Sequence, residues 1–177
     1  MMPKLEKGLI QVYTGNGKGK TSAAWGLALR AIGRGLKVYV IQFIKGGFDY
    51  GELRVLRRLP HLTLKAYGRG KFITAKPPEN EDIRLAEEAL RLAKTIIESG
   101  EYDIVILDEI NVALGLKLIK LQEVVETIKK KPEKVEIVLT GRNAPEQIIE
   151  LADLVTELKE IKHPFNKGFQ ARKGIEY

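Results

Sequence analysis

The fold is decided by residues 9–30, which read LIQVYTGNGKGKTSAAWGLALR. Residues 9–13 form a short run rich in β-formers, residues 14–21 are rich in glycine, and residues 23–34 place alanine, leucine and tryptophan at helical spacing. A glycine-rich loop that follows a strand, ends in Gly-Lys-Thr and opens a helix has the context of a phosphate-binding P-loop. We therefore predict strand, phosphate loop and helix in that order.

The chemistry of such a loop comes from backbone N–H groups that point at phosphate oxygens and from the positive end of the helix. We predict that Lys20 reaches the phosphates and that the Thr21 hydroxyl lies on Mg²⁺. The predicted nucleotide-binding residues are Gly15, Asn16, Gly17, Lys18, Gly19, Lys20, Thr21 and Ser22. Lys18 is either a phosphate ligand or a solvated charge. Thr14 stands where the usual pattern has its first glycine, so we expect a differently shaped cradle; a glycine-rich turn without a ligand is the alternative.

Strands and helices alternate along the rest of the chain. Apolar runs predict buried strands at residues 38–44, 102–107 and 135–139, and a further strand is predicted at 62–67. Half-polar alternation predicts an edge strand at 154–161. Helices are predicted at residues 51–59 and at residues 80–99, the latter with Asn80 as its cap and Gly100 as its end. A helical region follows the strand at 102–107 and runs to Lys131, with an interruption near Gly115. A last helix is predicted from Pro145 to about residue 153.

This pattern predicts an α/β fold: a single three-layer P-loop NTPase-like domain over residues 1–177, with a mostly parallel sheet flanked by helices. Residues 68–78 read as an irregular loop. Residues 163–177 are polar and basic, so we expect them to form either a disordered tail or a strap over the site.

Composition limits the kind of protein. The 177 residues suit one domain, and no apolar run approaches the roughly 18 residues of a membrane helix. The absence of cysteine excludes disulfides and thiolate metal sites, and the start of the chain lacks a secretion signal, so cytoplasmic location is the default expectation. The net charge of +7 raises the chance of a nucleic-acid partner, but interleaved lysine and glutamate are typical of solvated helix faces.

A second motif is the apolar run at 104–107 followed by Asp108 and Glu109. Carboxylates at the carboxyl end of a buried strand suit Mg²⁺, which prefers oxygen ligands, so we predict Thr21, Asp108 and Glu109 as metal ligands. An acidic pair that caps the following helix is the alternative. Arg142 follows a buried strand and is a candidate anion ligand, whereas Arg30 alone would more often be a surface residue.

Six blocks of sequence, taken in order, resemble the P-loop type of ATP:corrinoid adenosyltransferase. They are residues 14–24 (TGNGKGKTSAA), 30–35 (RAIGRG), 42–46 (QFIKG), 107–110 (LDEI), 140–145 (TGRNAP), and 162–165 (KHPF) together with 173–177 (KGIEY). The resemblance covers the chain from about residue 8 to its end. The shifted-glycine loop combined with the KGIEY ending is far more specific than a P-loop alone.

The resemblance implies transfer of the 5′-deoxyadenosyl group of ATP to the cobalt of a reduced cob(I)alamin or related corrinoid, with release of triphosphate. By carry-over, Lys20, Thr21 and Glu109 are the catalytic residues, Asp108 helps to hold Mg²⁺, and Arg30 and Arg142 bind the nucleotide. ATP and Mg²⁺ would be the cofactors. A homodimer and a reductase that supplies the reduced corrinoid are the implied partners.

Two departures from the family pattern matter. Of the family's aromatic pair beneath the corrin, Phe72 fits one member as a corrinoid-binding residue, but Thr74 stands at the tryptophan position. Only about eight residues precede the first predicted strand, where family members commonly carry a longer segment. Two other functions stay open: a recombination-type P-loop ATPase that acts with nucleic acid, and a small-molecule kinase, which is disfavoured because no arginine-rich lid is found.

Overall fold

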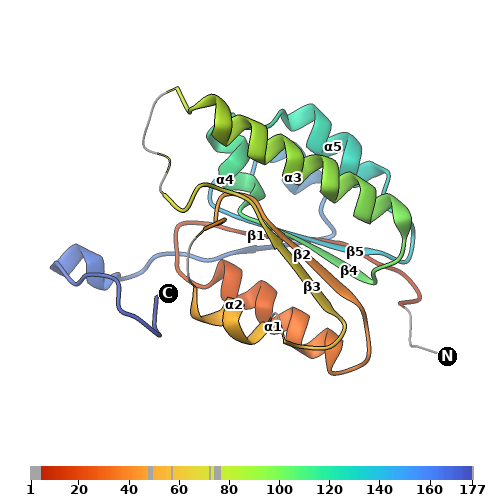
Figure 1. Cartoon of the computed structure of the whole chain (residues 1–177), viewed down its shortest axis with the longest axis horizontal. Helices are drawn as coiled ribbons and strands as arrows, with labels where there is room; N and C mark the ends of the chain where they lie inside the picture. The colour runs from red at the N-terminus through yellow and green to blue at the C-terminus, as the bar shows by residue number, and fades with distance from the viewer. Residues whose placement is uncertain (1–4, 48–49, 57, 72, 74–76, 177) are drawn as a thin grey trace.

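The computed structural model describes residues 5–47, 50–56, 58–71, 73 and 77–176 (Figure 1). One six-stranded sheet, in the order β3-β2-β4-β5-β1-β6, lies between two helical layers, and every neighbouring strand pair is parallel. The strands are β1 (Ile10–Thr14), β2 (Val38–Gln42), β3 (Leu62–Ala66), β4 (Ile104–Asp108), β5 (Glu136–Thr140) and β6 (Leu154–Glu157). The helices are α1 (Lys20–Ile32), α2 (Gly51–Leu56), α3 (Asn80–Ser99), α4 (Ile110–Gly115), α5 (Leu121–Lys129), α6 (Glu146–Leu151) and the 3₁₀ turn η1 (Pro164–Lys167). The predicted three-layer α/β fold is confirmed.

The central strands bury side chains on both faces, because successive residues of a strand point to opposite sides. Figure 1 shows α1 and α2 on one face and α3, α4 and α5 on the other. The first face buries Val38, Val40, Ile104, Ile106 and Val138 against α1 and α2. The second face buries Tyr39, Ile41, Val105, Leu107, Ile137 and Leu139 against the other helices. None of the helices in the described ranges is long and apolar enough to cross a membrane.

The strand order determines which loops meet. All strands are parallel, so their carboxyl ends lie at one edge of the sheet, where the phosphate loop, Asp108 and Arg142 also lie. The structure places β5 between β1 and β4, so Asp108 and the phosphate loop lie on either side of the end of β5.

Several predicted boundaries need correction. Asn80 is not the cap of α3 but its first helical residue, and Glu79 takes the N-cap position without a side-chain cap bond. Arg69 explains the difference, because it forms ion pairs with Glu79 and with Asp82 and so fixes the entry to the helix. Gly100 ends α3 as predicted, with a φ of 61°. The predicted edge strand is confirmed at β6 but ends at Glu157 rather than at residue 161.

The loops that follow β2 and β3 are locked together by glycines. The Gly46 N–H donates to the Tyr67 carbonyl at 2.7 Å, and the Gly70 N–H donates to the Gly46 carbonyl at 2.6 Å. A Cβ atom on Gly46 would lie 2.5 Å from the Gly68 nitrogen. Because the three nearest atoms all belong to the backbone of Tyr67 and Gly68, no side-chain rotation could relieve the clash.

We predict that Gly46→Ala lowers the free energy of unfolding by about 1–3 kcal/mol, the usual cost of forcing extra atoms into a packed site. Gly26→Ala is the matched control, because Gly26 lies within α1 and a Cβ there meets nothing within 4 Å. The control should be neutral or gain up to about 1 kcal/mol. Urea unfolding of both variants measures this, and equal stabilities would contradict the packing interpretation.

Candidate nucleotide and metal site

The phosphate loop spans the turn between β1 and α1. Gly15 and Gly19 have φ values of 94° and 116°, a region that L side chains rarely adopt. The helix begins only at Lys20 and has no side-chain cap. Its first N–H groups therefore lack intrahelical partners and carry the positive end of the helix dipole, as anion binding requires.

The chain that follows β6 determines the unusual glycine pattern. The Gly17 N–H donates to the Leu158 carbonyl at 2.6 Å. A Cβ on Gly15 or on Gly17 would lie 2.5 Å or 2.7 Å, respectively, from that same carbonyl oxygen. Both positions therefore need glycine because the backbone at Leu158 passes directly against the loop.

Lys20 is buried inside the loop. Its Nζ donates to the carbonyl oxygens of Gly15 and Gly17, both at 2.7 Å. Burial lowers the pKa of Lys20, and the positive charge of Arg142 lowers it further, while Glu109 opposes both. Arg142 and Glu109 are thus close enough to Lys20 to act on it electrostatically.

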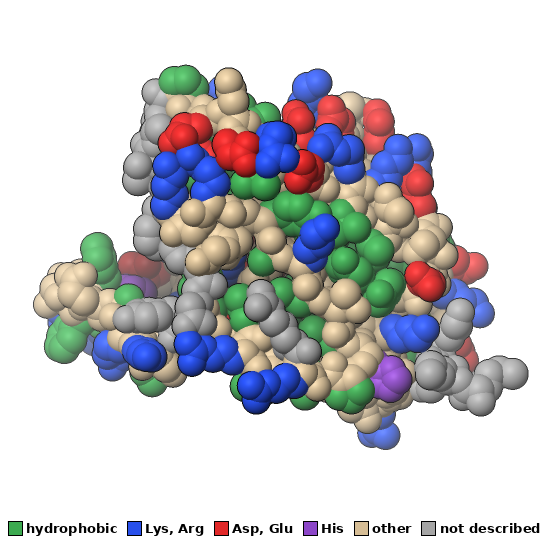
Figure 2. Space-filling view, in the orientation of Figure 1, with side chains coloured by type: hydrophobic (Ala, Val, Ile, Leu, Met, Phe, Trp, Pro, Cys, Tyr) green, Lys and Arg blue, Asp and Glu red, His purple; other side chains and the backbone are tan. Residues whose placement is uncertain are grey.

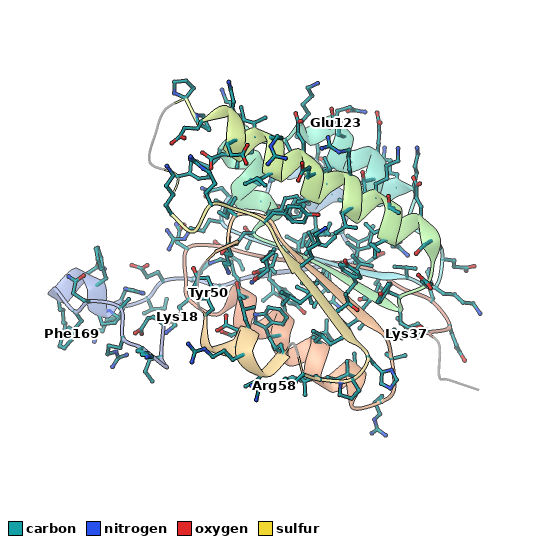
Figure 3. All side chains as sticks on the ribbon, in the orientation of Figure 1. Lys18, Lys37, Tyr50, Arg58, Glu123 and Phe169 are labelled. Atoms are coloured by element: carbon teal, nitrogen blue, oxygen red, sulfur yellow. The ribbon has the colours of Figure 1, made fainter. Side chains whose placement is uncertain are left out.

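Lys18 contacts the C-terminal tail, and its role as a phosphate ligand stays a prediction. Its Nζ lies 3.0 Å from Glu176 Oε1 and 3.1 Å from the Ile175 carbonyl, so it ties the loop to the C-terminal tail. Arg172 and Lys18 together hold the pKa of the partly exposed Glu176 carboxyl at about 2. Figure 3 shows Lys18 and Tyr50 projecting at the same end of the molecule, opposite to Lys37.

Asp108 is the centre of the site. It ends β4, is buried, and accepts four side-chain hydrogen bonds from four residues. Its Oδ1 accepts from the hydroxyls of Thr21 at 2.9 Å and Thr140 at 2.6 Å. Its Oδ2 accepts from Gln42 Nε2 and Lys45 Nζ, both at 3.0 Å.

The charges of Asp108 and Lys45 stabilise each other. Burial would raise the pKa of Asp108, but Lys45 and the hydrogen bonds from Thr140 and Gln42 outweigh burial and hold that pKa below its usual value. Burial likewise acts to lower the pKa of Lys45, and the carboxylates of Asp108 and Glu109 raise it above its usual value. Both groups are therefore charged near neutral pH.

Glu109 has a left-handed backbone, with a φ of 62°, which is uncommon for a residue other than glycine. Its N–H donates to the Thr140 hydroxyl at 2.9 Å, and its Oε1 lies 3.3 Å from Lys45 Nζ. Glu109 occupies the N-cap position of α4 but makes no side-chain cap bond. The helix-cap interpretation of the acidic pair is therefore wrong, because its carboxylates meet Lys45 and Thr21 instead.

The oxygen atoms of this cluster fit a small divalent cation. Thr21 Oγ1, Asp108 Oδ2 and Glu109 Oε1 lie 2.9, 3.0 and 3.3 Å from the Lys45 ammonium, so a positive charge already sits among them. Mg²⁺ is usually held by one or two carboxylates together with substrate phosphates and water. The described part of the chain contains no group of three or more His, Cys, Asp or Glu side chains that could hold a metal alone.

Lys45, like Gln42 and Thr140, is a site residue that the sequence did not lead us to assign. It follows β2 at the same sheet edge as Asp108, and its ammonium also lies 5.8 Å from the centre of the Tyr50 ring. Its place in the 42–46 block, just beyond a buried parallel strand, was the available signal, because ligands bind at the carboxyl ends of such strands.

The two candidate arginines differ. Arg142 follows Gly141 at the end of β5, beside the phosphate loop, and acts on the pKa of Lys20. Arg30 is exposed in the last turn of α1, which begins at Lys20, so about 15 Å of helix separates the two residues. Asn16 and Ser22 are exposed at the loop and at the first turn of α1. Phe72 and Thr74 lie outside the described residues.

The surface charge is largely paired on the helices. Figure 2 shows acidic and basic side chains interleaved along the helices at the top of the view. Arg84 forms ion pairs with Glu81 and Glu88, three and four residues away on α3. This arrangement is typical of a solvated helix face rather than of a nucleic-acid surface.

Comparison with known proteins gives a consistent result. Residues 6–177 match the model of the family described as ATP:corrinoid adenosyltransferase BtuR/CobO/CobP. A corrinoid adenosyltransferase of Sinorhizobium is 43% identical over 174 residues, which cover 97% of this chain and 81% of that protein. That of Escherichia coli K12 is 39% identical over 97% of this chain and 87% of its own length.

A solved structure shares the fold. The flagellar accessory protein FlaH of Methanocaldococcus jannaschii superposes with a TM-score of 0.54 at 15% identity, covering 86% of this chain and 72% of that one. At this identity the likeness supports only the α/β fold. The match to the family model over nearly the whole chain establishes the relationship: the chain belongs to the ATP:corrinoid adenosyltransferase family.

Proposed function

We propose that this chain transfers the 5′-deoxyadenosyl group of ATP to the cobalt of a reduced corrinoid, in cobalamin biosynthesis, and releases triphosphate. The proposal rests on one arrangement, in which Lys20 and the uncapped start of α1 face the same sheet edge as Thr21, Asp108 and Glu109. Membership of the adenosyltransferase family supports this choice among the reactions open to a P-loop protein.

The reaction asks the protein for positioning and charge stabilisation. The electron pair of cobalt(I) forms the new bond to C5′, and the bond from C5′ to the α-phosphate oxygen breaks. That oxygen keeps the bonding pair, so one negative charge develops on the departing triphosphate. Lys20, Arg142 and the loop amides are the groups placed to stabilise this charge, which is the largest contribution such a site can make.

Mg²⁺ is proposed as the metal, held by Thr21, Asp108 and Glu109 and supplying further neutralisation of the triphosphate when bound. Lys45 orients the carboxylates of Asp108 and Glu109 by contacting both. Thr140 orients Glu109 by accepting a hydrogen bond from its N–H. Phe72 remains the proposed corrinoid contact and Arg30 a proposed nucleotide contact away from the phosphate loop.

A homodimer, a reductase partner and a cytoplasmic location are proposed from the family. The tail offers support for the dimer, because Ile161, Phe165 and Phe169 are 89%, 65% and 61% exposed. Large apolar side chains gathered on one exposed segment are typical of contacts with another chain.

An activity assay distinguishes the proposed adenosyl transfer from the alternative function, an ATPase that acts with nucleic acid. Protein with ATP, Mg²⁺ and chemically reduced cob(I)alamin should convert the corrinoid spectrum to that of the adenosylated form and release one triphosphate per product. An unchanged spectrum, with orthophosphate release that responds to added DNA, would overturn the proposed activity.

We predict that Lys20→Ala lowers kcat/KM by roughly 30- to 1000-fold, equivalent to about 2–4 kcal/mol of lost transition-state stabilisation. The fold should persist, because the two hydrogen bonds of Lys20 go to the loop carbonyls of Gly15 and Gly17. Lys94→Ala, at an exposed position of α3, is the matched control and should turn over normally. Near-normal turnover of Lys20→Ala would contradict its assigned role.

We predict that Asp108→Asn destabilises the metal-free protein by about 3 kcal/mol, because the partly buried Lys45 loses its main counter-charge. Calorimetric ATP binding should also need more Mg²⁺ than in the wild type. Asp153→Asn makes the same change at an exposed carboxylate that accepts one bond from the Ile10 N–H, so it should cost far less. If the two variants unfold at the same urea concentration, the central role of Asp108 is wrong.

A further inference from the structure

The Lys45 ammonium has its hydrogen-bonding capacity filled by the proposed metal ligands. It contacts Thr21 Oγ1 at 2.9 Å, Asp108 Oδ2 at 3.0 Å and Glu109 Oε1 at 3.3 Å. An ammonium has three N–H donors, and three oxygens surround this one. Only 16% of the Lys45 side chain is exposed, so water contributes little to its solvation.

The backbone fixes where this side chain starts. The Phe43 N–H donates to the Asp108 carbonyl at 3.0 Å, which continues the pairing of β2 with β4. On the other side of Lys45, the bonds of Gly46 to Tyr67 and Gly70 hold the loop against the loop after β3. Lys45 is therefore directed at the carboxylates by rigid neighbours on both sides.

We propose that Lys45 is a positioning residue whose ammonium serves as the counter-cation of the metal-free site. When a divalent cation binds, the ammonium leaves the carboxylates of Asp108 and Glu109 to that cation. The same oxygens cannot serve both cations at close range, because two positive charges about 3 Å apart repel strongly. Metal entry therefore requires the ammonium to leave Asp108 and Glu109. The inference rests on the proposed metal ligands but does not depend on the adenosyl-transfer step.

This exchange couples metal binding to polyphosphate binding. An ammonium released into a largely dry site needs another anion, since an unpaired buried charge is costly. The phosphate loop ends next to Thr21, so a polyphosphate bound there would supply that anion at the same sheet edge. Metal alone should then bind weakly, whereas metal and polyphosphate should each strengthen the binding of the other by the same factor.

A purely structural ion pair would behave differently. Loss of Lys45 would then reduce stability and leave the affinity for metal unchanged or weaker. If Lys45 competes with the metal, its removal increases the affinity of the nucleotide-free protein for the metal. The sign of the change in metal affinity separates the two roles without any measurement of activity.

Titration with Mn²⁺, followed by electron paramagnetic resonance, tests the proposal on nucleotide-free protein. Lys45→Met should bind Mn²⁺ at least about tenfold more tightly than the wild type. Tripolyphosphate should tighten Mn²⁺ binding more in the wild type than in the variant. Lys94→Met removes one charge from an exposed position on α3 and should match the wild type. Equal or weaker Mn²⁺ binding by a folded Lys45→Met would overturn the proposal.

A second measurement covers the case in which Lys45→Met does not fold. In wild-type protein with ¹⁵N-labelled lysine, Lys45 Nζ should give a slowly exchanging signal, assigned by its loss in Lys45→Arg. Addition of Mg²⁺ with tripolyphosphate should shift or abolish that signal. An Nζ signal that is unchanged at saturation would show that the ammonium stays in place and would overturn the proposal.

Discussion

The buried carboxylate of Asp108 is the constraint on which the rest of the site depends. A buried charge must be paired and hydrogen-bonded, and Asp108 is 1% exposed. Its partners come from both neighbouring strands: Gln42 from β2, which pairs with Asp108 in register, and Thr140 from β5. The carboxylate of Asp108 can therefore be buried only where β4 lies between β2 and β5, and its hydrogen bonds in turn hold these strands in that order.

The same carboxylate joins the sheet to the phosphate loop. Thr21, in the first turn of α1, donates to Asp108, while Gly17 at the other side of the loop donates to Leu158. The loop is thereby held at two points, with Lys20 between them. Because β5 separates β1 from β4, the loop reaches Asp108 across the end of β5, and Thr140 at that end binds both Asp108 and the Glu109 N–H.

Local patterns in the sequence predicted most of the fold. The strand, loop and helix of residues 10–32, the buried strands and the long α3 follow from periodicity and glycine positions that act over a few residues. The order of strands did not follow, because the pairing of β1 with β5 joins segments that are far apart in the chain, such as Ile10 and Ile137. The cap of α3 was wrong for a different reason, since Arg69, ten residues earlier in the connection from β3, binds Glu79 with its side chain.

The acidic site residues at strand ends could be predicted from the sequence. The residues whose long side chains can reach several alternative partners could not. Thr21, Asp108 and Glu109 converge as the parallel sheet requires. Lys45 lay at the correct edge, but nothing local indicates that its long side chain turns to the carboxylates rather than to water. Arg30 was taken from a resemblance, and the length of α1 keeps it from the loop.

The two lysines of the phosphate loop have separate roles because of the C-terminal part of the chain. After β6 the backbone at Leu158 presses on Gly15 and Gly17, which accounts for the displaced glycines without reference to a ligand. Further along, Glu176 returns to bind Lys18, so this cation points to the tail. Lys20 is left as the loop lysine that faces inward, and its lowered pKa reflects burial and the nearby charge of Arg142. A P-loop of this shape therefore depends on the backbone at Leu158 as much as on its own glycines.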